Sequence, residues 1–339
     1  MNTTTLIFCV SVLAALAATP AGADVTHPDA AVRKAGKPLR VRDPFIVVDG
    51  GRYLLVSSTG EAVGPETDSF GENRDVVTVR ESADMVNWSA PTTVLKLPKD
   101  FDSAALWAPE MHRYRGDWYL VVTVNYRDRK AGRGERGTWV FRSKSPKGPF
   151  VPHSRGSITP ESWCALDGTL YIEDGHPYMV FCHEWIQVDP GTICAVRMTD
   201  DLAAAVGEPF VLFDAALGEK GSNVTDGPWL FKDKSGALQM LWSSGIRARK
   251  WRYGVLQSTS KNGRLAGQWS DTKVVLDNDE GHGMLFTDLQ GHLRFAFHGP
   301  NTLPNERLKI LSCEITDRGL RLLKERSGGP KHVTPPKNF

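Results

Sequence analysis

Hydrophobic positions along the chain recur in pairs of short runs. Each pair has an apolar run, a tight turn that contains glycine, and a second run rich in aromatic and β-branched residues, which is the pattern of a β-hairpin. Five such units follow one another: "DPFIVVDGGRYLLVSS", "APEMHRYRGDWYLVVTVN", "DGTLYIEDGHPYMVFCHEW", "DGPWLFKDKSGALQMLWSS" and "HGMLFTDLQGHLRFAFHGP". After the N-terminal segment, no window of a dozen residues keeps an apolar stripe at helical spacing. The pattern therefore predicts an all-β protein.

The spacing of the turn glycines predicts a repeat architecture. The five turns contain Gly51, Gly116, Gly175, Gly236 and Gly291, which follow one another at similar intervals. A period of about 60 residues that is built from hairpins indicates repeated units rather than chance. Radial repetition lets such hairpins bury both faces and protect their edges. We therefore expect a five-bladed β-propeller over residues 24–325.

Ionisable residues open the first strand of every unit: Asp43, Glu110, Asp167, Asp226 and His282. The first strand of a propeller blade lines the central channel, so we expect these residues to form a ring at one mouth. The second strand returns to the same face, because it covers a similar length at roughly 3.3 Å per residue. Its ends add Ser58, Asn125, Glu184, Ser244 and His298, and the rim adds Trp107, Trp163, Trp185 and Trp229. Acids among aromatic faces suit a sugar ligand.

Composition and the chain ends change this picture little. Of 339 residues, 41% are hydrophobic and 24% charged, and the net charge of +2 gives no reason to expect nucleic acid or a membrane surface as partner. Residues 1–23 have an apolar stretch followed by small residues, as in a signal peptide, and predict a secreted or periplasmic protein without a membrane span. Residues 326–339 are basic and rich in Pro and Gly, and predict a flexible tail.

Four cysteines remain after removal of the predicted signal peptide: Cys164, Cys182, Cys194 and Cys313. Cys182 and Cys194 could pair across a hairpin in an oxidising compartment. A domain of this size does not need disulfides, and buried free thiols are the favoured interpretation. The cysteine spacings match no zinc motif.

Three carboxylates at one mouth suit glycoside hydrolysis. One acid must protonate the leaving oxygen, while another, ionised, acts on the opposite side of the ring. A third carboxylate beside the acid raises its pKa by like-charge repulsion and keeps it protonated near neutral pH. Arg42, next to Asp43 in the chain, is expected to hold the pKa of Asp43 down.

Five segments together, in this order and spacing, resemble glycoside hydrolase family 43: "RDPFIVVDGGRYLL", "LWAPEMHRYRGDWYL", "ALDGTLYIEDGHPYMVF", "TDGPWLFK" and "GHGMLF". That family comprises five-bladed propellers with α-L-arabinofuranosidase, β-xylosidase and arabinanase activities that invert the anomeric centre. The resemblance covers essentially the whole mature chain. It implies that Asp43 is the general base and that Asp167 tunes the pKa of the acid and orients it.

The general acid is the point at which this chain departs from the family. Family members have a glutamate opening an E-G-P segment, where this chain has Asp226. Aspartate is one methylene shorter, and a misplacement of about 1 Å can cost about 100-fold in rate. Either the backbone compensates and Asp226 is the acid, or Glu184 reaches in from the third blade. The blade period favours Asp226 and the side-chain type favours Glu184.

The remaining candidate site residues concern substrate and metal. Trp107, Glu110, Trp185, His298 and Arg307 are the substrate-binding candidates, although Glu110 could instead cap the channel with hydrogen bonds. His282 matches a channel histidine that binds a metal ion, often calcium, in relatives, and could equally be a histidine satisfied by protein contacts. We expect no organic cofactor.

The sequence therefore predicts an exported, inverting, exo-acting glycosidase of α-L-arabinofuranosidase or β-xylosidase type. A β-galactofuranosidase or an endo-arabinanase on the same fold is an alternative. A carbohydrate-binding propeller without catalysis is the alternative from another class. The expected partner is an oligo- or polysaccharide, and the sequence leaves the oligomeric state open.

Overall fold

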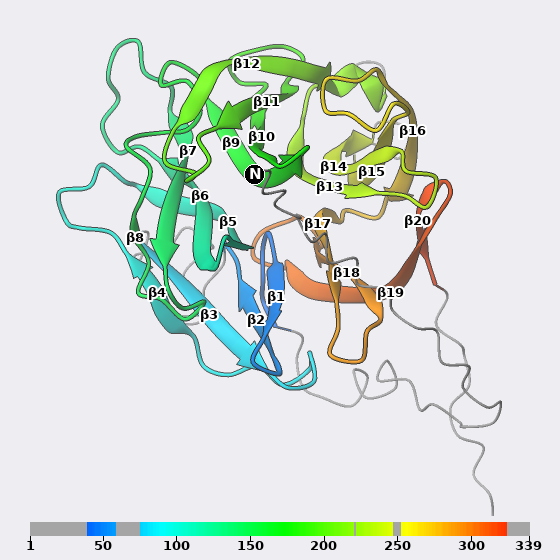
Figure 1. The fold of residues 1–339 in the computed structure, drawn as a ribbon, viewed down its shortest axis with the longest axis horizontal. Helices are drawn as coiled ribbons and strands as arrows, with labels where there is room; N and C mark the ends of the chain where they lie inside the picture. The colour runs from blue at the N-terminus through cyan, green and yellow to red at the C-terminus, as the bar shows by residue number, and fades with distance from the viewer. Residues whose placement is uncertain (1–38, 59–74, 220–221, 247–251, 324–339) are drawn as a thin grey trace, which may run out of the picture.

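The structure is a five-bladed β-propeller, which confirms the fold expected from the repeat. The computed structural model describes residues 39–58, 75–219, 222–246 and 252–323. The predicted signal peptide and C-terminal tail lie outside these residues. Five four-stranded antiparallel sheets follow one another around a centre, from blue β1–β4 to orange β17–β20 (Figure 1). Within the described residues, no helix is long and apolar enough to cross a membrane.

Each blade takes its four strands in chain order. Blade 1 contains β1 (Phe45–Asp49), β2 (Arg52–Val56), β3 (Val76–Ser82) and β4 (Thr92–Lys96). Blade 2 contains β5 (Ala105–Tyr114), β6 (Asp117–Asn125), β7 (Arg136–Ser143) and β8 (Val151–Pro152). Blade 3 contains β9 (Ala165–Glu173), β10 (His176–His183), β11 (Thr192–Met198) and β12 (Ala205–Asp214). Blade 4 contains β13 (Asp226–Lys232), β14 (Leu238–Ile246), β15 (Arg252–Ser260) and β16 (Trp269–Leu276). Blade 5 contains β17 (Gly281–Thr287), β18 (Leu293–Gly299), β19 (Arg307–Thr316) and β20 (Gly319–Leu322).

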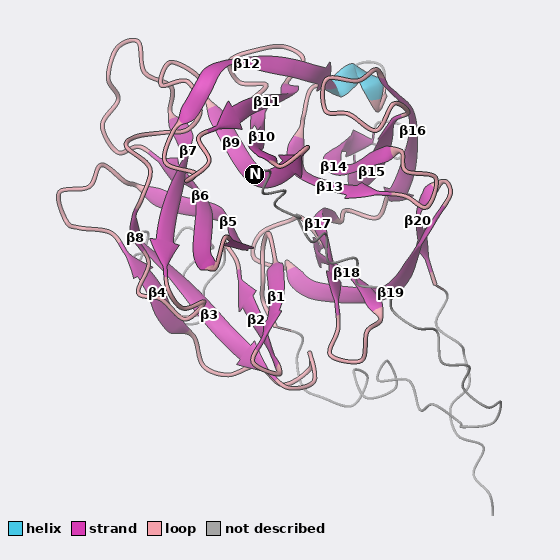
Figure 2. Ribbon diagram, viewed as in Figure 1, coloured by secondary structure: helices cyan, strands magenta, loops and turns pink. Residues whose placement is uncertain are grey.

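Strands dominate every blade, and the described helical structure is the single 3-10 turn η1 (Ala215–Leu217) (Figure 2). The first strands β1, β5, β9, β13 and β17 each contact the first strand of the next blade and so surround the centre. The turn that joins each first strand to the second contains a glycine at positive φ, between 73° at Gly51 and 91° at Gly116. A side chain is strained in that conformation, which is why the glycine pattern marked the five hairpins.

The hydrophobic core lies between blades rather than at the centre. One apolar cluster joins blades 1, 2 and 5 through residues such as Phe45, Leu120 and Phe286. Another joins blades 3 and 4 through residues such as Val180 and Trp242, and two further clusters fill the 2–3 and 4–5 boundaries. Every residue of β6 and β14 is buried, because a second strand packs against a neighbouring blade on both faces. That explains the nearly continuous apolar runs of these strands.

Blades 1 and 5 close the ring without sharing a strand. Each is built from one continuous part of the chain, so contacts between the two blades must hold the circle shut. The N–H of Leu308 donates to the carbonyl of Leu39 at 3.0 Å, and the N–H of Leu289 donates to the hydroxyl of Tyr53 at 3.0 Å. These bonds add directional contacts to the shared apolar cluster.

One backbone feature repeats in all five blades at the channel mouth. A residue at or just before the first strand adopts the left-handed conformation, with φ between 42° and 56°. The five residues are Asp43, Ala108, Asp167, Gly227 and His282. In blades 2 to 5 this residue lies where the pairing of the first two strands shifts register, as at a β-bulge. The bulge turns the backbone N–H of this residue out of its own ladder.

That N–H donates to a side chain of the preceding blade at all five boundaries, and at four of them the acceptor lies on or just after the second strand of that blade. Ser58 Oγ accepts from Ala108 at 2.5 Å, Thr123 Oγ1 from Asp167 at 2.9 Å, Ser243 Oγ from His282 at 2.8 Å, and His298 Nδ1 from Asp43 at 3.2 Å. At the boundary between blades 3 and 4, the N–H of Gly227 donates to Asp167 Oδ2 at 2.9 Å. The mouth is therefore a ring of bonds from blade to blade.

The repeated position differs from the one inferred from the ionisable residues. Asp43, Asp167 and His282 occupy it, but Ala108 and Gly227 take the places that were assigned to Glu110 and Asp226. The left-handed residue precedes the turn glycine by 8 residues in blades 1 to 3 and by 9 in blades 4 and 5, so a constant count would have identified it. The requirement for an ionisable residue is what moved the expected position to Glu110 and Asp226.

We expect the left-handed position to reverse the usual effect of glycine. In Ala108→Gly, relief of a left-handed strain of about 1 kcal/mol offsets the entropic cost of glycine, so the free energy of unfolding changes by less than about 0.5 kcal/mol. Ala105→Gly, in the same strand at negative φ, lowers it by about 1 kcal/mol. Urea unfolding of the two variants measures both values. Equal losses in the two would contradict a strained Ala108.

Candidate active site

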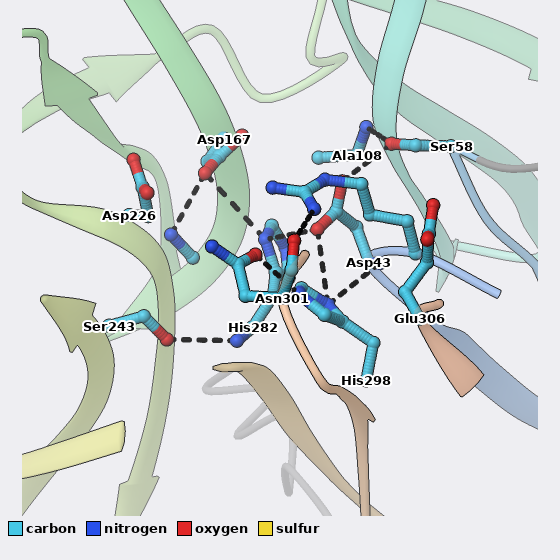
Figure 3. A network of polar contacts seen from close by, with 12 residues as sticks. Asp43, Ser58, Ala108, Asp167, Asp226, Ser243, His282, His298, Asn301 and Glu306 are labelled. Atoms are coloured by element: carbon cyan, nitrogen blue, oxygen red, sulfur yellow. Dashed lines mark hydrogen bonds and ion pairs between the residues drawn. The ribbon is translucent and has the colours of Figure 1, made fainter. Parts of the chain in front are cut away.

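Three aspartates from three blades face one another at the channel mouth. Asp43 precedes β1, Asp167 lies in β9 and Asp226 begins β13. The ring of His282, from β17, lies between Asp43 and Asp167 (Figure 3). The structure thus brings together the three predicted acids and the predicted channel histidine.

Asp43 is held by both of its carboxylate oxygens. Ser58 Oγ donates to Oδ2 at 2.7 Å, and Arg42 Nε lies 4.0 Å from the same oxygen. Oδ1 lies 3.3 Å from His282 Nδ1 and 3.5 Å from His298 Nδ1 (Figure 3). The side chain of Asp43 is still 12% exposed, which leaves access from the mouth.

His298 supports Asp43 from within the protein. Its side chain is fully buried. Nδ1 accepts the N–H of Asp43, and Nε2 lies 2.9 Å from Asn301 Oδ1, so the neutral tautomer with hydrogen on Nε2 satisfies both contacts. Burial lowers the pKa of His298 to about 4, which keeps the ring neutral at neutral pH. The predicted sugar contact is thus replaced by two protein hydrogen bonds.

The pKa of Asp43 lies below its ordinary value. Burial alone would raise it, but the charges of His282 and Arg42 and the Ser58 hydrogen bond outweigh that effect. His298 also lowers the pKa of Asp43 when charged, but this ring is neutral at neutral pH. Arg42 lowers the pKa of Asp43, as expected, and the effect of His282 on this pKa is the larger of the two.

Asp167 has the opposite electrostatic environment. Its pKa is well above the ordinary value, first because of burial and then because of the charge of Asp43. The Gly227 hydrogen bond lowers this pKa, while the charges of Glu184 and Glu110 raise it. Asp167 therefore favours the protonated form beside an ionised Asp43.

Asp226 is held by a tyrosine that the sequence did not single out. The hydroxyl of Tyr253, in β15, donates to Asp226 Oδ2 at 2.9 Å. Gly281 makes room for the tyrosine ring, since a Cβ at this position would lie 1.8 Å from Tyr253 Cε1. Burial and then the charge of Asp167 raise the pKa of Asp226 to about 7. A carboxyl with this pKa can hold and release a proton near neutral pH.

His282 fits a protein-satisfied role better than a calcium site. Its main-chain N–H donates to Ser243 Oγ, and Nδ1 faces Asp43 and Asp167. Within the described residues, no group of three or more His, Cys, Asp or Glu side chains is arranged to hold a metal ion. Calcium takes six to eight oxygen ligands. The side chains around His282 do not reach that number by themselves, and the calcium site stays a prediction.

Glu184, the alternative acid, is tied to blade 2. Its Oε2 forms an ion pair with Arg136 and accepts from Cys164 Sγ at 3.2 Å. Arg136 in turn stacks over Trp107 at 4.8 Å and donates to Asn125. These two contacts hold the Glu184 carboxyl against Arg136 and Cys164.

The floor of the channel is aromatic. Phe45 makes edge contacts with His112 at 5.2 Å and with Trp229 at 5.5 Å, which joins blades 1, 2 and 4. Glu110 is buried and lies 2.8 Å from Nε2 of His112. This arrangement corresponds to the alternative in which Glu110 caps the channel.

The contacts of the other predicted substrate residues are with groups other than the three acids. The Trp185 side chain, next to Glu184 in the chain, is 43% exposed. Trp107 is covered by Arg136, and Trp163 stacks on His183 at 4.1 Å. Arg307 donates to carbonyls of its own loop, those of Pro304 and Glu306.

The four described cysteines are free and buried, as expected. In the β10–β11 ladder Cys194 pairs with Phe181, and Cys182 pairs with Ile193. The two thiols are therefore offset by one position, and the alternative disulfide is wrong.

We expect opposite effects on stability from neutralising the two neighbouring acids. Because the pKa of Asp167 is raised, the folded protein keeps a proton on this group that the unfolded chain loses above about pH 4. This difference lowers the free energy of unfolding, and increasingly so as the pH rises. The lowered pKa of Asp43 stabilises the fold above about pH 4 and loses that effect as the pH falls. At pH 7.5, Asp167→Asn therefore raises the Tm and Asp43→Asn lowers it, each by about 2 °C or more. Calorimetry measures both, and shifts of the same sign would contradict the assignment.

Comparison with known proteins agrees with this site. The model of glycosyl hydrolases family 43 matches residues 36–318. An extracellular exo-α-(1→5)-L-arabinofuranosidase of Cellvibrio japonicus is 25% identical, over 85% of this chain and 83% of its own. One from Streptomyces chartreusis is 22% identical, over 66% of each. The crystal structure of an endo-arabinase from Bacteroides thetaiotaomicron has a TM-score of 0.72 and 35% identity, over 82% of this chain and 96% of its own. With a family match across most of its length and the acids in place at the mouth, the chain belongs to glycosyl hydrolase family 43 and is a glycosidase.

Proposed function

We propose that this glycosidase hydrolyses α-L-arabinofuranosyl linkages with inversion, using Asp43 as general base and Asp226 as general acid. The observation that carries the proposal is the contrast between two carboxyls at one mouth: the pKa of Asp43 is lowered and that of Asp226 is raised to about 7. Environments that separate two pKa values in this way assign the base and the acid.

Asp43 has the properties of a base for water activation. It is ionised, its main-chain N–H is fixed by His298, and Ser58 and Arg42 orient one oxygen. In an inverting reaction this carboxylate takes a proton from water as the water attacks the anomeric carbon. The proton passes to Asp43, and the bond to the leaving oxygen breaks on the opposite face of the sugar.

Asp226 donates the proton that the leaving oxygen needs. Tyr253 holds one carboxyl oxygen, so the other can carry the proton toward the substrate. Burial keeps that proton in place by raising the pKa of Asp226, and the charge of Asp167 adds to this effect whenever Asp167 is ionised. The role proposed for Asp167 is thus electrostatic, and its bond to Gly227 ties it to the residue after the acid.

Asp226 is a better acid than Glu184 for a geometric reason. Asp226 lies immediately before the repeated left-handed position, so its side chain leaves the strand at a different point from those of Asp43 and Asp167. This offset gives the backbone a way to compensate for the shorter side chain. Glu184 is engaged by Arg136 and Cys164, and its charge raises the pKa of Asp226.

The substrate class follows from relatives of both cleavage modes. Two curated relatives are exo-acting arabinofuranosidases, and a structural relative with 35% identity is an endo-arabinase. Both modes act on arabinose-containing chains, so we propose arabinan or arabinofuranosyl side chains as the substrate. A β-xylosidase or β-galactofuranosidase activity is the alternative within the family.

Secretion is part of the proposal. Two curated relatives are extracellular, and the N-terminal residues have the pattern of a signal peptide. We also propose that Trp185, half-exposed beside Glu184, offers an apolar face to a sugar ring at the rim.

The proposed activity is tested with aryl α-L-arabinofuranoside, β-D-xyloside and β-D-galactofuranoside and with debranched arabinan. We expect turnover of the arabinofuranoside and arabinan, and an inverted anomer as the first product by proton NMR. Asp43→Asn lowers kcat by about 100- to 10,000-fold, because the base is lost. Single arabinose units as the only early product indicate exo action, and oligomers indicate endo action. No turnover of any substrate, or a retained anomer, contradicts the proposal.

The identity of the acid is tested by its dependence on the leaving group. We expect Asp226→Asn to lose about 100-fold or more on arabinan but only a few-fold on a dinitrophenyl glycoside, whose leaving group needs no proton. The wild-type kcat/KM on arabinan should fall above about pH 7, where Asp226 loses its proton.

Glu184→Gln is the matched variant for this experiment. It should lose less than about tenfold, by a similar factor on both substrates, because it perturbs the Arg136 contact rather than proton transfer. A leaving-group-dependent loss in Glu184→Gln, and its absence in Asp226→Asn, would move the acid to Glu184.

A further inference from the structure

At one of the five boundaries, the one beside the proposed acid, the bond from blade to blade takes its acceptor from a different position. In blade 1 the residue that accepts the N–H of the next blade is Ser58, and in blades 2, 4 and 5 it is Thr123, Ser243 and His298. Each acceptor follows the left-handed residue of its own blade at a nearly constant interval along the chain. In blades 2, 4 and 5 it also sits opposite the residue before the left-handed one, as Thr123 does opposite Trp107.

Cys182 occupies this position in blade 3. It follows Asp167 at the same interval and lies opposite Leu166 in the β9–β10 ladder, and its side chain is fully buried. After burial, the charges of Asp167 and Asp226 raise the pKa of the Cys182 thiol, so its side chain lies beside both acids. The hydroxyl of Thr225 acts in the other direction and lowers this pKa.

Thiol sulfur is a weak acceptor compared with a hydroxyl or an imidazole nitrogen. The N–H of Gly227 accordingly donates to Asp167 Oδ2 at 2.9 Å rather than to residue 182. We propose that Cys182 is a positioning residue, because its weak acceptor leaves the Gly227 amide free to bind Asp167.

The diverted bond places Asp167 for its proposed work. It joins the carboxyl of Asp167 to the residue that follows Asp226, and so sets the distance between the two acids. Glycine makes room at the donor, because a Cβ at this position would lie 2.9 Å from Cγ of His282. The amide can thus approach Asp167 closely while His282 covers its other side.

A simpler role for Cys182 is to fill space between blades, and substitution separates the two roles. Cys182→Ser keeps the volume but offers a hydroxyl that competes for the Gly227 amide. Cys182→Ala leaves a small cavity and offers no acceptor. We expect Cys182→Ser to lose about tenfold in kcat with KM within about threefold, and Cys182→Ala to keep the larger share of kcat. A filler role predicts the reverse order, and that result overturns the proposal.

A second readout does not depend on turnover. The hydrogen bond from Gly227 favours the charged form of Asp167, so its loss raises the pKa of Asp167 further. The Tm of Cys182→Ser should therefore fall more steeply between pH 5 and pH 8 than that of Cys182→Ala. Equal slopes in the two variants overturn the proposal.

Cys194→Ser is the matched control for this readout. It also replaces a fully buried thiol in blade 3, but its sulfur contacts Thr192. We expect Cys194→Ser to keep the wild-type dependence of Tm on pH.

The inference rests on the roles proposed for Asp167 and Asp226, yet the two can fail separately. If the wild-type enzyme cleaves no glycoside, the proposed function fails, while the pH slopes still decide whether residue 182 controls the Gly227 amide. If the enzyme is active and the Tm of Cys182→Ser and of Cys182→Ala depends on pH with the same slope, only the positioning role fails.

Discussion

The whole mouth of the channel depends on one repeated constraint, a left-handed residue whose N–H is taken by the preceding blade. The conformation costs about 1 kcal/mol for any residue with a Cβ, and four of the five positions carry one. It persists because the bulge turns the amide toward a fixed acceptor, at distances of 2.5 to 3.2 Å. Strain that recurs at a shared mouth is characteristic of functional sites.

That constraint explains how similar aspartates acquire different chemistry. Asp43 and Asp167 occupy the same position in two blades, but their surroundings differ. Asp43 meets Ser58, Arg42 and His282, which favour its charge, whereas Asp167 is buried and faces the charge of Asp43. The fold supplies equivalent positions, and the neighbouring side chains decide whether each carboxyl is a base or a proton holder.

Asp226 shows how a departure from the family pattern is accommodated. It lies outside the repeated position, where Gly227 takes the left-handed conformation, and its carboxyl is held by Tyr253. Tyr253 also stacks on His298, with ring centroids 6.2 Å apart, and His298 binds the main chain of Asp43. The proposed acid and the proposed base are thus joined by a short path of contacts through blades 4, 5 and 1. The proposal allows for a shorter acid because the neighbours of Asp226, and not its length alone, determine where the proton lies.

The sequence by itself determined the five hairpins, the propeller, the three aspartates and His282. It did so because glycine at positive φ and alternating apolar runs are local requirements that leave a visible period. It did not determine which residues of blades 2 and 4 take the left-handed position, the support of Asp43 by His298, or the engagement of Glu184 by Arg136. Tyr253 comes from a third strand, in which no repeated residue type marks the mouth, and Cys182 resembled an ordinary buried thiol. The nearly constant interval from each left-handed residue would have marked the accepting positions, but only the structure shows what they accept. The tertiary fold decided these roles because a pKa and a hydrogen bond depend on atoms from different blades.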